Sequence, residues 1–510
     1  MLAKTKSYAL YGLNGIEVVV EADVQKTGEQ PRFDIVGLPD ASVKESKERV
    51  RAAIKNSSFS FPNTVITVNL APADVKKEGS SFDLPIAVAL LKCCDSALVR
   101  DVVDTVFLGE LSLEGAVRSV RGVLPIVLSA KKSGIKRVVL PSANAKEASL
   151  VEGIEIIAVD TLKEVVGFLK GNEIAPYPFT EYAPDKGDAV YDNDLCFVKG
   201  QYAAKRAIEV AVSGGHNILM VGSPGSGKTM IAKCIPSIMP DMTFDEAIET
   251  TAIHSVSGVL DEKLGVVSVR PFVTPHHTAS NVSLIGGGTG VKPGLISLAH
   301  NGVLYLDEMP EYSRSALESL RQPLEDGVVT VSRAKGSVKY PSDFMLVASM
   351  NPCPCGNYGS ETQVCKCTDS QIRKYRSKIS GPLLDRIDIQ IQVDGVKYDD
   401  LTSDAQEEHS AQVRKRVNRA RRIQRERFAF DGITSNSQMS ERQIAKYCAL
   451  SADCEELMRK SFVSLGLSAR ARSRILKVAR TIADLDYSEH VLKKHLLEAI
   501  GYRSFEFEKD

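Results

Sequence analysis

A glycine-rich turn in the middle of the chain most constrains the fold. The stretch NILMVGSPGSGKTM, residues 217–230, is a short apolar run that leads into a match to G-x-x-x-x-G-K-[ST]. Such a turn points backbone N–H groups at phosphates, at the start of a helix whose dipole also favours anions. The pattern predicts an ATP site built from Gly222, Ser223, Pro224, Gly225, Ser226, Gly227, Lys228 and Thr229.

A second nucleotide element follows the turn by some 80 residues. In GVLYLDEMPE, residues 302–311, an apolar strand delivers Asp307 and Glu308 to its carboxyl end. We expect Asp307 to hold Mg²⁺ together with Thr229, and Glu308 to orient and deprotonate the attacking water. Acidic residues often end buried strands, so the pair is informative only in combination with the glycine-rich turn.

Length, charge and cysteine usage bound the class of protein. A chain of 510 residues predicts two to four domains. Lys plus Arg and Asp plus Glu both number 64, which excludes a uniformly basic nucleic-acid binder but leaves room for a local basic surface. The sequence shows neither a run of roughly 18 apolar residues nor the features of a signal peptide. We therefore expect a cytoplasmic protein with no membrane contact, whose ten cysteines are thiols or metal ligands rather than disulfides.

The first 172 residues alternate strand-like and helix-like stretches, which predicts an α/β or α+β domain. GIEVVVEADV and TVITVNLAP are typical of strands, whereas DASVKESKERVRAAIKNS and DLPIAVALLKCC are typical of helices. Residues 173–195 hold three prolines and no clear periodicity, so we interpret them as a linker.

Three further stretches after the acidic pair hold candidate catalytic residues. FMLVASMNP is a strand that ends at Asn351, which could also simply open a turn. SGPLLDRIDIQIQV places Arg386 before another strand, where an ion pair with a neighbouring aspartate is the alternative. LGLSARARSRILKVARTIADLD is a basic amphipathic helix with Arg470 near its start and Arg472 as a substitute, or simply a solvated face.

This series of motifs resembles the Mg chelatase-like AAA+ ATPases and, more narrowly, the YifB/ComM family. The motifs that carry the resemblance are RPFVTPHHTASNVSLIGGG, PGLISLAHNGVLYLDEMPE, NPCPCGNYG and SGPLLDRIDI. The resemblance implies an α/β fold with a Lon-protease-like domain at 1–172, an AAA+ P-loop core of the Mg chelatase/MCM type at 196–400, and a helical insert with a C-terminal lid at 401–510.

The same resemblance assigns roles to single residues. It implies that Val198 and Gln201 lie near the adenine and that Asn351 positions the attacking water. It implies that Arg386 reaches the nucleotide of a neighbouring subunit and that Arg470 is the lid arginine. One family member is a hexameric DNA helicase that drives branch migration, so the implied partners are single-stranded or branched DNA, further copies of the chain and recombination proteins.

Part of the first domain also resembles the proteolytic domain of Lon, in KKEGSSFDLPIAVAL and FLGELSLEGAVRSVRGVLPIVLSAKKSGIKRVVLPSAN. That resemblance places Ser81 at the position of the catalytic serine. The position of the activating lysine, however, is Leu124. Without that amine nothing evident activates the hydroxyl, so we expect an inactive domain that serves as an adaptor or DNA-side collar.

A hairpin is expected at residues 327–341, GVVTVSRAKGSVKYP, with a tip at Ala334, Lys335 and Gly336. In the related MCM helicases a hairpin in this place contacts DNA, so Arg333 and Lys335 are candidates for phosphate contacts, although a solvated tip is the alternative. The glycine-rich insert from Asn281 to Gly290 suits a pore loop or a plain turn.

Cys353, Cys355, Cys365 and Cys367 form C-x-C-x₉-C-x-C, which predicts a structural Zn²⁺ site, with four reduced surface thiols as the alternative. His276 and His277 are adjacent and have no ligand close in sequence, so we interpret them as structural or interfacial. The basic segment 409–428 fits DNA binding as well as it fits a solvated helix or an arm between subunits.

Three functions remain open at this point. The first is an ATP-driven DNA translocase or helicase that promotes branch migration in recombination or natural transformation. The second is a chelatase-like ATPase that remodels a protein partner. The third is an ATP-dependent protease, which Leu124 argues against. Stimulation of ATP turnover by single-stranded or forked DNA separates them.

Overall fold

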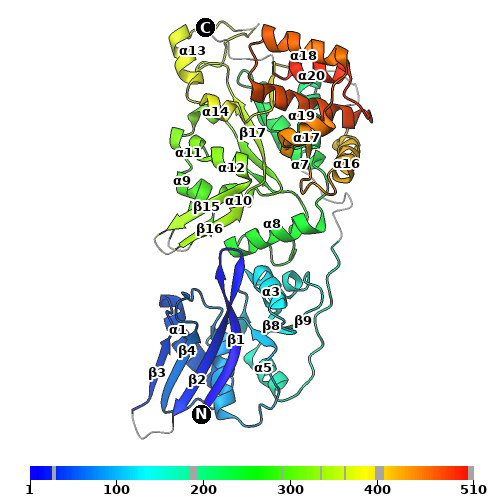
Figure 1. The fold of residues 1–510 in the computed structure, drawn as a ribbon. Helices are drawn as coiled ribbons and strands as arrows, with labels where there is room; N and C mark the ends of the chain where they lie inside the picture. Colours follow the sequence, from blue (N-terminus) through cyan, green and yellow to red (C-terminus); the bar gives the residue numbers. More distant parts are fainter. Residues whose placement is uncertain are drawn as a thin grey trace. The chain divides into compact units, whose positions relative to one another are not determined.

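The structure is a computed structural model that describes residues 1–25, 30–182, 193–288, 291–333, 336–360, 363–396 and 407–503. The chain forms two compact units (Figure 1). Unit 1 comprises Met1–Ala183 and Phe244–Val267, and unit 2 comprises Pro184–Thr243 and Ser268–Asp510. Within the described residues, no helix combines the length and apolar character needed to cross a membrane.

Unit 1 is built on a seven-stranded mixed sheet with strand order β3-β4-β2-β1-β5-β8-β9. Apolar residues alternate with polar ones along β2, so Val18, Val20, Ala22 and Val24 share the buried face. The pairs β1–β2 and β2–β4 are antiparallel and the other neighbours are parallel. The strands are β1 (Leu2–Tyr11), β2 (Asn14–Gln25), β3 (Arg32–Val36), β4 (Val65–Ala71), β5 (Thr105–Phe107), β8 (Arg137–Pro141) and β9 (Glu155–Val159), with a small ribbon of β6 (Glu110–Leu111) and β7 (Val117–Arg118).

The helices of unit 1 form where the sequence favours them. Asp40 caps the first of them by accepting from the Val43 N–H at 2.8 Å. The second is apolar on every side and is almost fully buried, as a central helix must be. The helices are α1 (Ala41–Asn56), α2 (Asp83–Cys94), α3 (Val123–Lys132), α4 (Ser142–Ala148), α5 (Leu162–Leu169) and α8 (Phe244–Ser257). The expected helices at DASVKESKERVRAAIKNS and DLPIAVALLKCC are confirmed.

Helix α8 belongs to unit 1 although it follows the glycine-rich turn in sequence (Figure 1). Ala252 and Ile248 of α8 pack into the apolar cluster that α3 helps to form. The hydroxyl of Ser255 donates to the buried carboxyl of Glu147, which also accepts from the Leu124 N–H at 2.8 Å. Burial raises the pKa of Glu147. An internal segment of the expected 196–400 core therefore completes the core of the first unit.

Unit 2 is built on a five-stranded parallel sheet with strand order β11-β14-β17-β10-β18. Every residue of the three central strands is buried, which is typical of a parallel sheet covered on both faces. The strands are β10 (Ile218–Val221), β11 (Phe272–Val273), β14 (Val303–Leu306), β17 (Met345–Met350) and β18 (Ile389–Gln392). Because parallel strands end at one edge, the segments that follow β14, β17 and β10 lie side by side.

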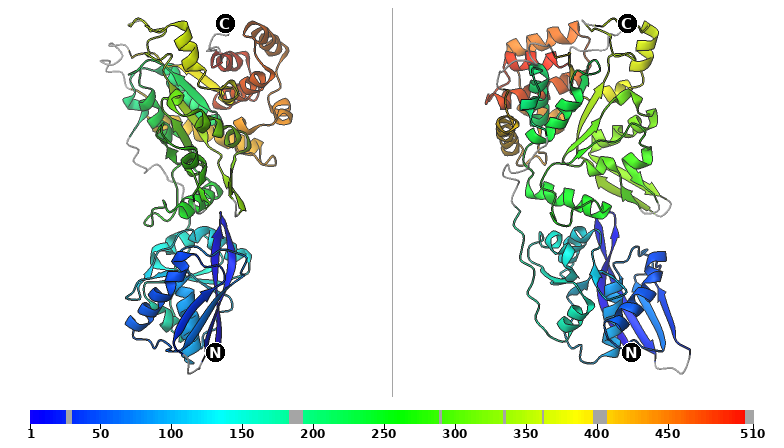
Figure 2. Two further views of the ribbon diagram at one scale, coloured as in Figure 1. Left: turned by 90° about the vertical axis from the view of Figure 1, so that its left-hand side faces the viewer. Right: turned by 180° about the vertical axis from the view of Figure 1, so that it is seen from behind.

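Helices surround this sheet, and those that follow residue 410, orange to red in Figure 2, gather on one side of it. Helices α16 and α19 pack against α6 there. The helices, including three short 3₁₀ turns, are η1 (Leu195–Phe197), α6 (Tyr202–Gly214), α7 (Lys228–Ile238), α9 (Asn281–Ile285), α10 (Leu295–Leu298), η2 (Met309–Glu311), α11 (Arg314–Ser319), α12 (Arg321–Asp326), α13 (Asp369–Arg376), α14 (Gly381–Leu384), α16 (Ser410–Arg427), η3 (Asn436–Gln438), α17 (Glu441–Tyr447), α18 (Ala452–Ser464), α19 (Ala469–Leu485) and α20 (Lys493–Gly501). The expected combination of a parallel α/β sheet and C-terminal helices is confirmed.

Two antiparallel ribbons extend unit 2. β15 (Val328–Arg333) pairs with β16 (Gly336–Pro341), so the expected hairpin is confirmed. β12 (Gly286–Gly287) pairs with β13 (Lys292–Pro293) and follows α9, so the glycine-rich insert is a short helix with a ribbon.

Candidate functional site

The glycine-rich turn joins β10 to α7 at the carboxyl ends of the parallel strands. Gly225 and Gly227 have φ of 78° and 90°, a backbone region that L side chains rarely adopt. In the described structure no side chain caps the N-terminus of α7, which leaves its first N–H groups to a ligand. This arrangement matches a phosphate-binding turn, and we refer to residues 222–229 as the P-loop.

Lys228 lies inside the P-loop rather than in solvent. Its Nζ donates to the carbonyl oxygens of Gly222 at 2.7 Å and Ser223 at 2.8 Å, and lies 3.5 Å from Oδ1 of Asn351. Burial lowers the pKa of Lys228, while the charges of Asp307 and Glu308 oppose that shift. The ammonium therefore lies where the P-loop, the acidic pair and the end of β17 meet.

Thr229 and Asp307 are brought together as expected for a shared Mg²⁺. The Thr229 hydroxyl donates to Oδ2 of Asp307 at 3.1 Å. Burial alone would raise the pKa of Asp307, but hydrogen bonds from Ser349, Tyr305 and Thr229 outweigh it and lower the pKa. A charged carboxylate beside a hydroxyl is the hard oxygen set that Mg²⁺ prefers, so these residues fit the ion.

Ser349 is a support of this pair that the sequence analysis missed. Its hydroxyl, fully buried on β17, donates to Oδ1 of Asp307 and accepts from the Glu308 N–H at 3.2 Å. Tyr305, on β14, bonds Thr229 at 3.5 Å through its hydroxyl, and burial raises the pKa of this phenol to about 12. A serine two residues before Asn351 is a usable sequence signal, because alternate residues of a strand share a face.

Glu308 leaves the strand in a left-handed conformation with φ of 50°, and its side chain is exposed. A non-glycine residue held in this region carries backbone strain, which is often found at functional sites. The turn separates the two carboxylates, so that Asp307 is hydrogen-bonded within the site while Glu308 is free to meet a bound ligand.

Gln201 also contacts the P-loop. With φ of 55°, it donates through Nε2 to the carbonyl of Ser226 at 3.2 Å and to that of Asp394 at 2.6 Å. Val198, three residues earlier, is buried in the core of unit 2. The segment expected near the adenine therefore abuts the phosphate loop.

Arg386 contacts Glu325 of α12 and Pro382, elsewhere in unit 2. The Arg386 guanidinium pairs with the Glu325 carboxylate and donates to the Pro382 carbonyl at 2.7 Å. Arg386 holds the pKa of Glu325 below its usual range, and the charge of Arg470 acts in the same direction. The described contacts of Arg386 are therefore not to the P-loop of the same chain.

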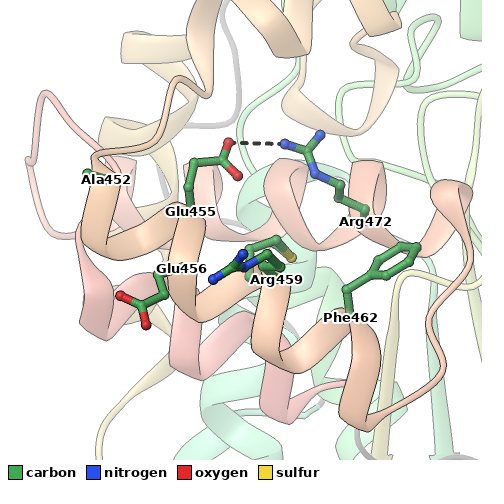
Figure 3. Close-up of a pocket in the computed structure, with 7 residues that line it drawn as sticks. Ala452, Glu455, Glu456, Arg459, Phe462 and Arg472 are labelled. Carbon is green, nitrogen blue, oxygen red and sulfur yellow. Dashed lines mark hydrogen bonds and ion pairs between the residues drawn. The ribbon is translucent and has the colours of Figure 1, made fainter.

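Arg472, the alternative lid residue, faces a different surface. In Figure 3 it points from α19 towards Glu455 of α18, with which it forms an ion pair at 3.2 Å. Arg459 and Phe462 of α18 line the same shallow pocket.

The four cysteines converge as expected. The Sγ of Cys353 lies 3.4 Å from that of Cys355 and 3.7 Å from that of Cys365, and all four sulfurs, including that of Cys367, lie within 4.8 Å of one another. Zn–S bonds of about 2.3 Å in a tetrahedron require sulfur separations of about 3.8 Å. The cluster therefore fits a closed Zn²⁺ site, whereas a disulfide needs about 2.05 Å.

Comparisons with known proteins agree with this site. The family model described as magnesium chelatase, subunit ChlI, matches residues 194–401, its C-terminal model matches 407–503, and a model described as subunit ChlI of Mg-chelatase matches 20–144. Competence protein ComM of Haemophilus influenzae is 42% identical over 509 residues, which cover 99% of this chain and 97% of that protein. The protein YifB of Escherichia coli is 39% identical over 98% of this chain and 96% of its own length.

The chain belongs to the YifB/ComM family of Mg chelatase-like AAA+ proteins. The N-terminal likeness to Lon also has a counterpart, because Lon protease 2 of Bacillus subtilis is 32% identical over 190 residues, 34% of this chain and 33% of that protein.

In this YifB/ComM chain, the Lon-like serine lacks a partner amine at the matching position. Leu124 is fully buried on α3. Lys77, close in sequence to Ser81, is buried too and donates to the Pro72 carbonyl. Ser80 donates to Glu110 in the turn before α2. These contacts are those of a structural turn.

The hairpin and the basic helix differ in how much the structure describes. Lys335 and Ala334 lie outside the described residues, and the side chain of Arg333 is not described. In α16, by contrast, three arginines make ion pairs within unit 2: Arg414 with Asp241 at 3.0 Å, Arg416 with Glu209 at 2.5 Å and Arg427 with Asp484 at 2.9 Å. One face of α16 therefore packs within unit 2, whereas Lys415, Arg419, Arg422 and Arg425 are exposed on the other.

The rings of His276 and His277 lie 4.2 Å apart between centroids and are tilted by 33°, and Nδ1 of His276 bonds the Thr278 hydroxyl at 2.8 Å. Neither residue is part of a described cluster of metal-ligating side chains. The structural interpretation of this pair remains a prediction.

Proposed function

We propose that this chain hydrolyses ATP with Mg²⁺ and uses the energy to move single-stranded or branched DNA through a homo-hexameric ring, promoting branch migration in recombination or natural transformation. The observation that carries the ATPase is the meeting of Lys228, Thr229, Asp307 and Asn351 at one sheet edge. The DNA substrate rests on the similarity to Competence protein ComM and on the hairpin of β15 and β16. Recombination proteins are the expected partners.

Each residue has a defined part in the hydrolysis. The P-loop N–H groups and Lys228 bind the phosphates, and Thr229 and Asp307 hold the Mg²⁺ that neutralises the developing charge. Glu308 takes the proton of the attacking water, and Asn351 orients that water. Arg386 acts on the nucleotide of a neighbouring subunit, and Arg470 serves as the lid arginine. The described contacts of Arg386, to Glu325 and to the Pro382 carbonyl, lie outside the P-loop of its own chain, which supports action between subunits.

The division of the chain forms part of the proposal. Residues 1–172 serve as an adaptor or collar for DNA, 173–195 as a linker, 196–400 as the motor core and 401–510 as the lid. Proteolysis is not part of it, because Leu124 stands where an activating lysine is needed.

Glu308→Gln tests the motor. The variant should bind ATP with wild-type affinity but lose turnover, since only water activation is removed. Lys228→Ala should lose affinity itself. A Glu308→Gln protein that hydrolyses ATP at the wild-type rate contradicts the assignment.

The DNA step is tested at the hairpin tip. Arg333→Ala with Lys335→Ala should keep basal ATP turnover but lose its stimulation by forked DNA, and each lost phosphate contact should reduce the salt slope of DNA binding by roughly one. Lys339→Ala is the matched control, an exposed lysine on β16 away from the tip. If the tip variant unwinds forked DNA as well as wild type, remodelling of a protein partner becomes the better function. The matches to the magnesium chelatase subunit models allow that alternative.

The cysteine cluster is proposed to hold one structural Zn²⁺ per chain. Protein purified without added zinc should contain one equivalent by metal analysis, and Cys365→Ser with Cys367→Ser should remove it. Cys94→Ser, at an exposed cysteine outside the cluster, should retain it. Metal-free wild-type protein with intact turnover contradicts the site.

A further inference from the structure

The four-cysteine segment, residues 353–367, touches the P-loop through a glycine. Gly356 has φ of 82°, and a Cβ built on it would lie 2.4 Å from Cδ and 2.7 Å from Cγ of Pro224. Non-bonded carbon atoms do not approach that closely, so only glycine lets this segment lie so near the Pro224 ring. Pro224 is the middle of the P-loop. Gly356 therefore packs directly against Pro224 of the P-loop.

The four-cysteine cluster fixes the position of Gly356. Gly356 follows Cys355 directly, and its N–H donates to the Cys353 carbonyl at 3.0 Å. The Tyr358 N–H donates to the Cys353 sulfur at 3.3 Å. Cys353 itself is fully buried. Gly356 is thus held by its covalent bond to Cys355 and by its hydrogen bond to the Cys353 carbonyl. The Cys353 sulfur accepts the next hydrogen bond of the same turn, from Tyr358.

The ends of the segment are also tied to the nucleotide site. Asn351, two residues before the first cysteine, lies 3.5 Å from the Lys228 ammonium. Beyond the last cysteine, Arg376 of α13 donates to the Pro352 carbonyl at 3.2 Å and lies over the Tyr358 ring at 5.0 Å. The described part of the segment meets the P-loop at Gly356 with Pro224, and Asn351, which precedes the segment, meets it at Lys228.

We infer that the four-cysteine segment is a positioning element for the P-loop, so that metal occupancy of the cluster controls nucleotide affinity. The inference rests on the proposed ATP site. When the sulfurs are cross-linked by a metal, Gly356 and Asn351 hold Pro224 and Lys228 in the binding conformation. Without the cross-link, that conformation is one of several. If only a tenth of the molecules then hold it, the apparent Kd for nucleotide rises about tenfold.

Two glycine variants separate the contact from general strain in the segment. Gly356→Ala introduces a Cβ against Pro224, whereas Gly359→Ala introduces one with nothing within 4 Å. Both positions have positive φ, 82° and 76°, so the backbone strain of the two substitutions is matched. Titration with the fluorescent nucleotide mant-ATP and Mg²⁺ should show about tenfold weaker binding for Gly356→Ala. Gly359→Ala should stay within about twofold of wild type, and both should retain one zinc.

Metal removal is the second test. Wild-type protein stripped with a zinc chelator, and shown by circular dichroism to remain folded, should bind mant-ATP about tenfold more weakly, and added zinc chloride should restore the affinity. If the stripped protein unfolds, the glycine pair decides, because those variants keep all four sulfurs.

The outcomes are distinguishable from failure of the proposed ATP site. Wild-type protein that binds no nucleotide overturns the ATP site and this inference with it. Wild-type protein that binds mant-ATP while Gly356→Ala binds as tightly as Gly359→Ala overturns this inference alone. Folded, zinc-free wild-type protein with undiminished affinity does the same.

Discussion

Ser349→Ala tests whether the support of the acidic pair, and not only the pair itself, determines how Mg²⁺ binds. The change removes the hydroxyl that donates to Asp307 and accepts from the Glu308 N–H, in a strand where the side chain is fully buried. A hydrogen bond to a charged group contributes about 1.5–3 kcal/mol, which corresponds to roughly 10- to 150-fold in an equilibrium constant. Loss of a residue that orients a metal ligand costs about 10- to 100-fold in metal affinity.

The assay is ATP turnover as a function of Mg²⁺ concentration. The half-saturating Mg²⁺ concentration of Ser349→Ala should rise by about ten- to a hundredfold, with partial recovery of turnover at high Mg²⁺. Ser342→Ala is the control, because Ser342 is also buried and its hydroxyl has no hydrogen-bond partner among the described residues. If both variants melt alike and both keep the wild-type Mg²⁺ dependence, Ser349 does not orient Asp307.

Three other predictions address contacts outside the P-loop. Glu325→Gln weakens the ion pair with Arg386, in which the carboxylate is exposed to solvent. Such a pair contributes up to about 1 kcal/mol, so ATP turnover of the assembled protein should rise up to about fivefold, and a fall to the level of Arg386→Ala refutes this. Mixing Arg386→Ala with Lys228→Ala subunits should restore part of the turnover, and absence of recovery in proven mixed assemblies counts against action between subunits. Burial raises the pKa of the Glu147 carboxyl, so its contribution to the free energy of unfolding falls as pH rises from the pKa of the unfolded chain to that of the folded one. The slope is about 1.4 kcal/mol per pH unit, and Glu147→Gln should remove it. The measurement is the difference in melting temperature between variant and wild type as a function of pH.

Local sequence patterns were sufficient to predict much of the nucleotide site. The P-loop, the strand before Asp307 and the strand before Asn351 each have a signature within ten residues, and parallel strands bring their carboxyl ends together. The helix at residues 83–94 was equally predictable, because a long apolar run without strand punctuation favours a buried helix.

What escaped prediction depends on contacts between distant segments. Glu325 and Arg386 are 61 residues apart, and nothing near either one in sequence indicates the other. In the sequence, Gly356 and Gly359 are both glycines of the same loop, and nothing nearby tells them apart. Only the proximity of Pro224 to Gly356 in the structure distinguishes them. The packing of α8 in unit 1 is the largest feature that the sequence did not predict. An amphipathic helix shows that one of its faces will be buried, but not against which part of the chain.

The insertion of α8 sets an order on folding during synthesis. Every strand of the unit 1 sheet has been made once Val159 has been added, yet Ile248 and Ala252, which complete its second apolar cluster, come some 90 residues later. At 5–20 residues per second that delay is about 4 to 18 s, during which the apolar face of α3 and the Glu147 carboxyl lack their cover. A chain cut before Phe244 would therefore keep a full sheet with an open core, and it should depend on chaperones and aggregate more readily than the whole protein.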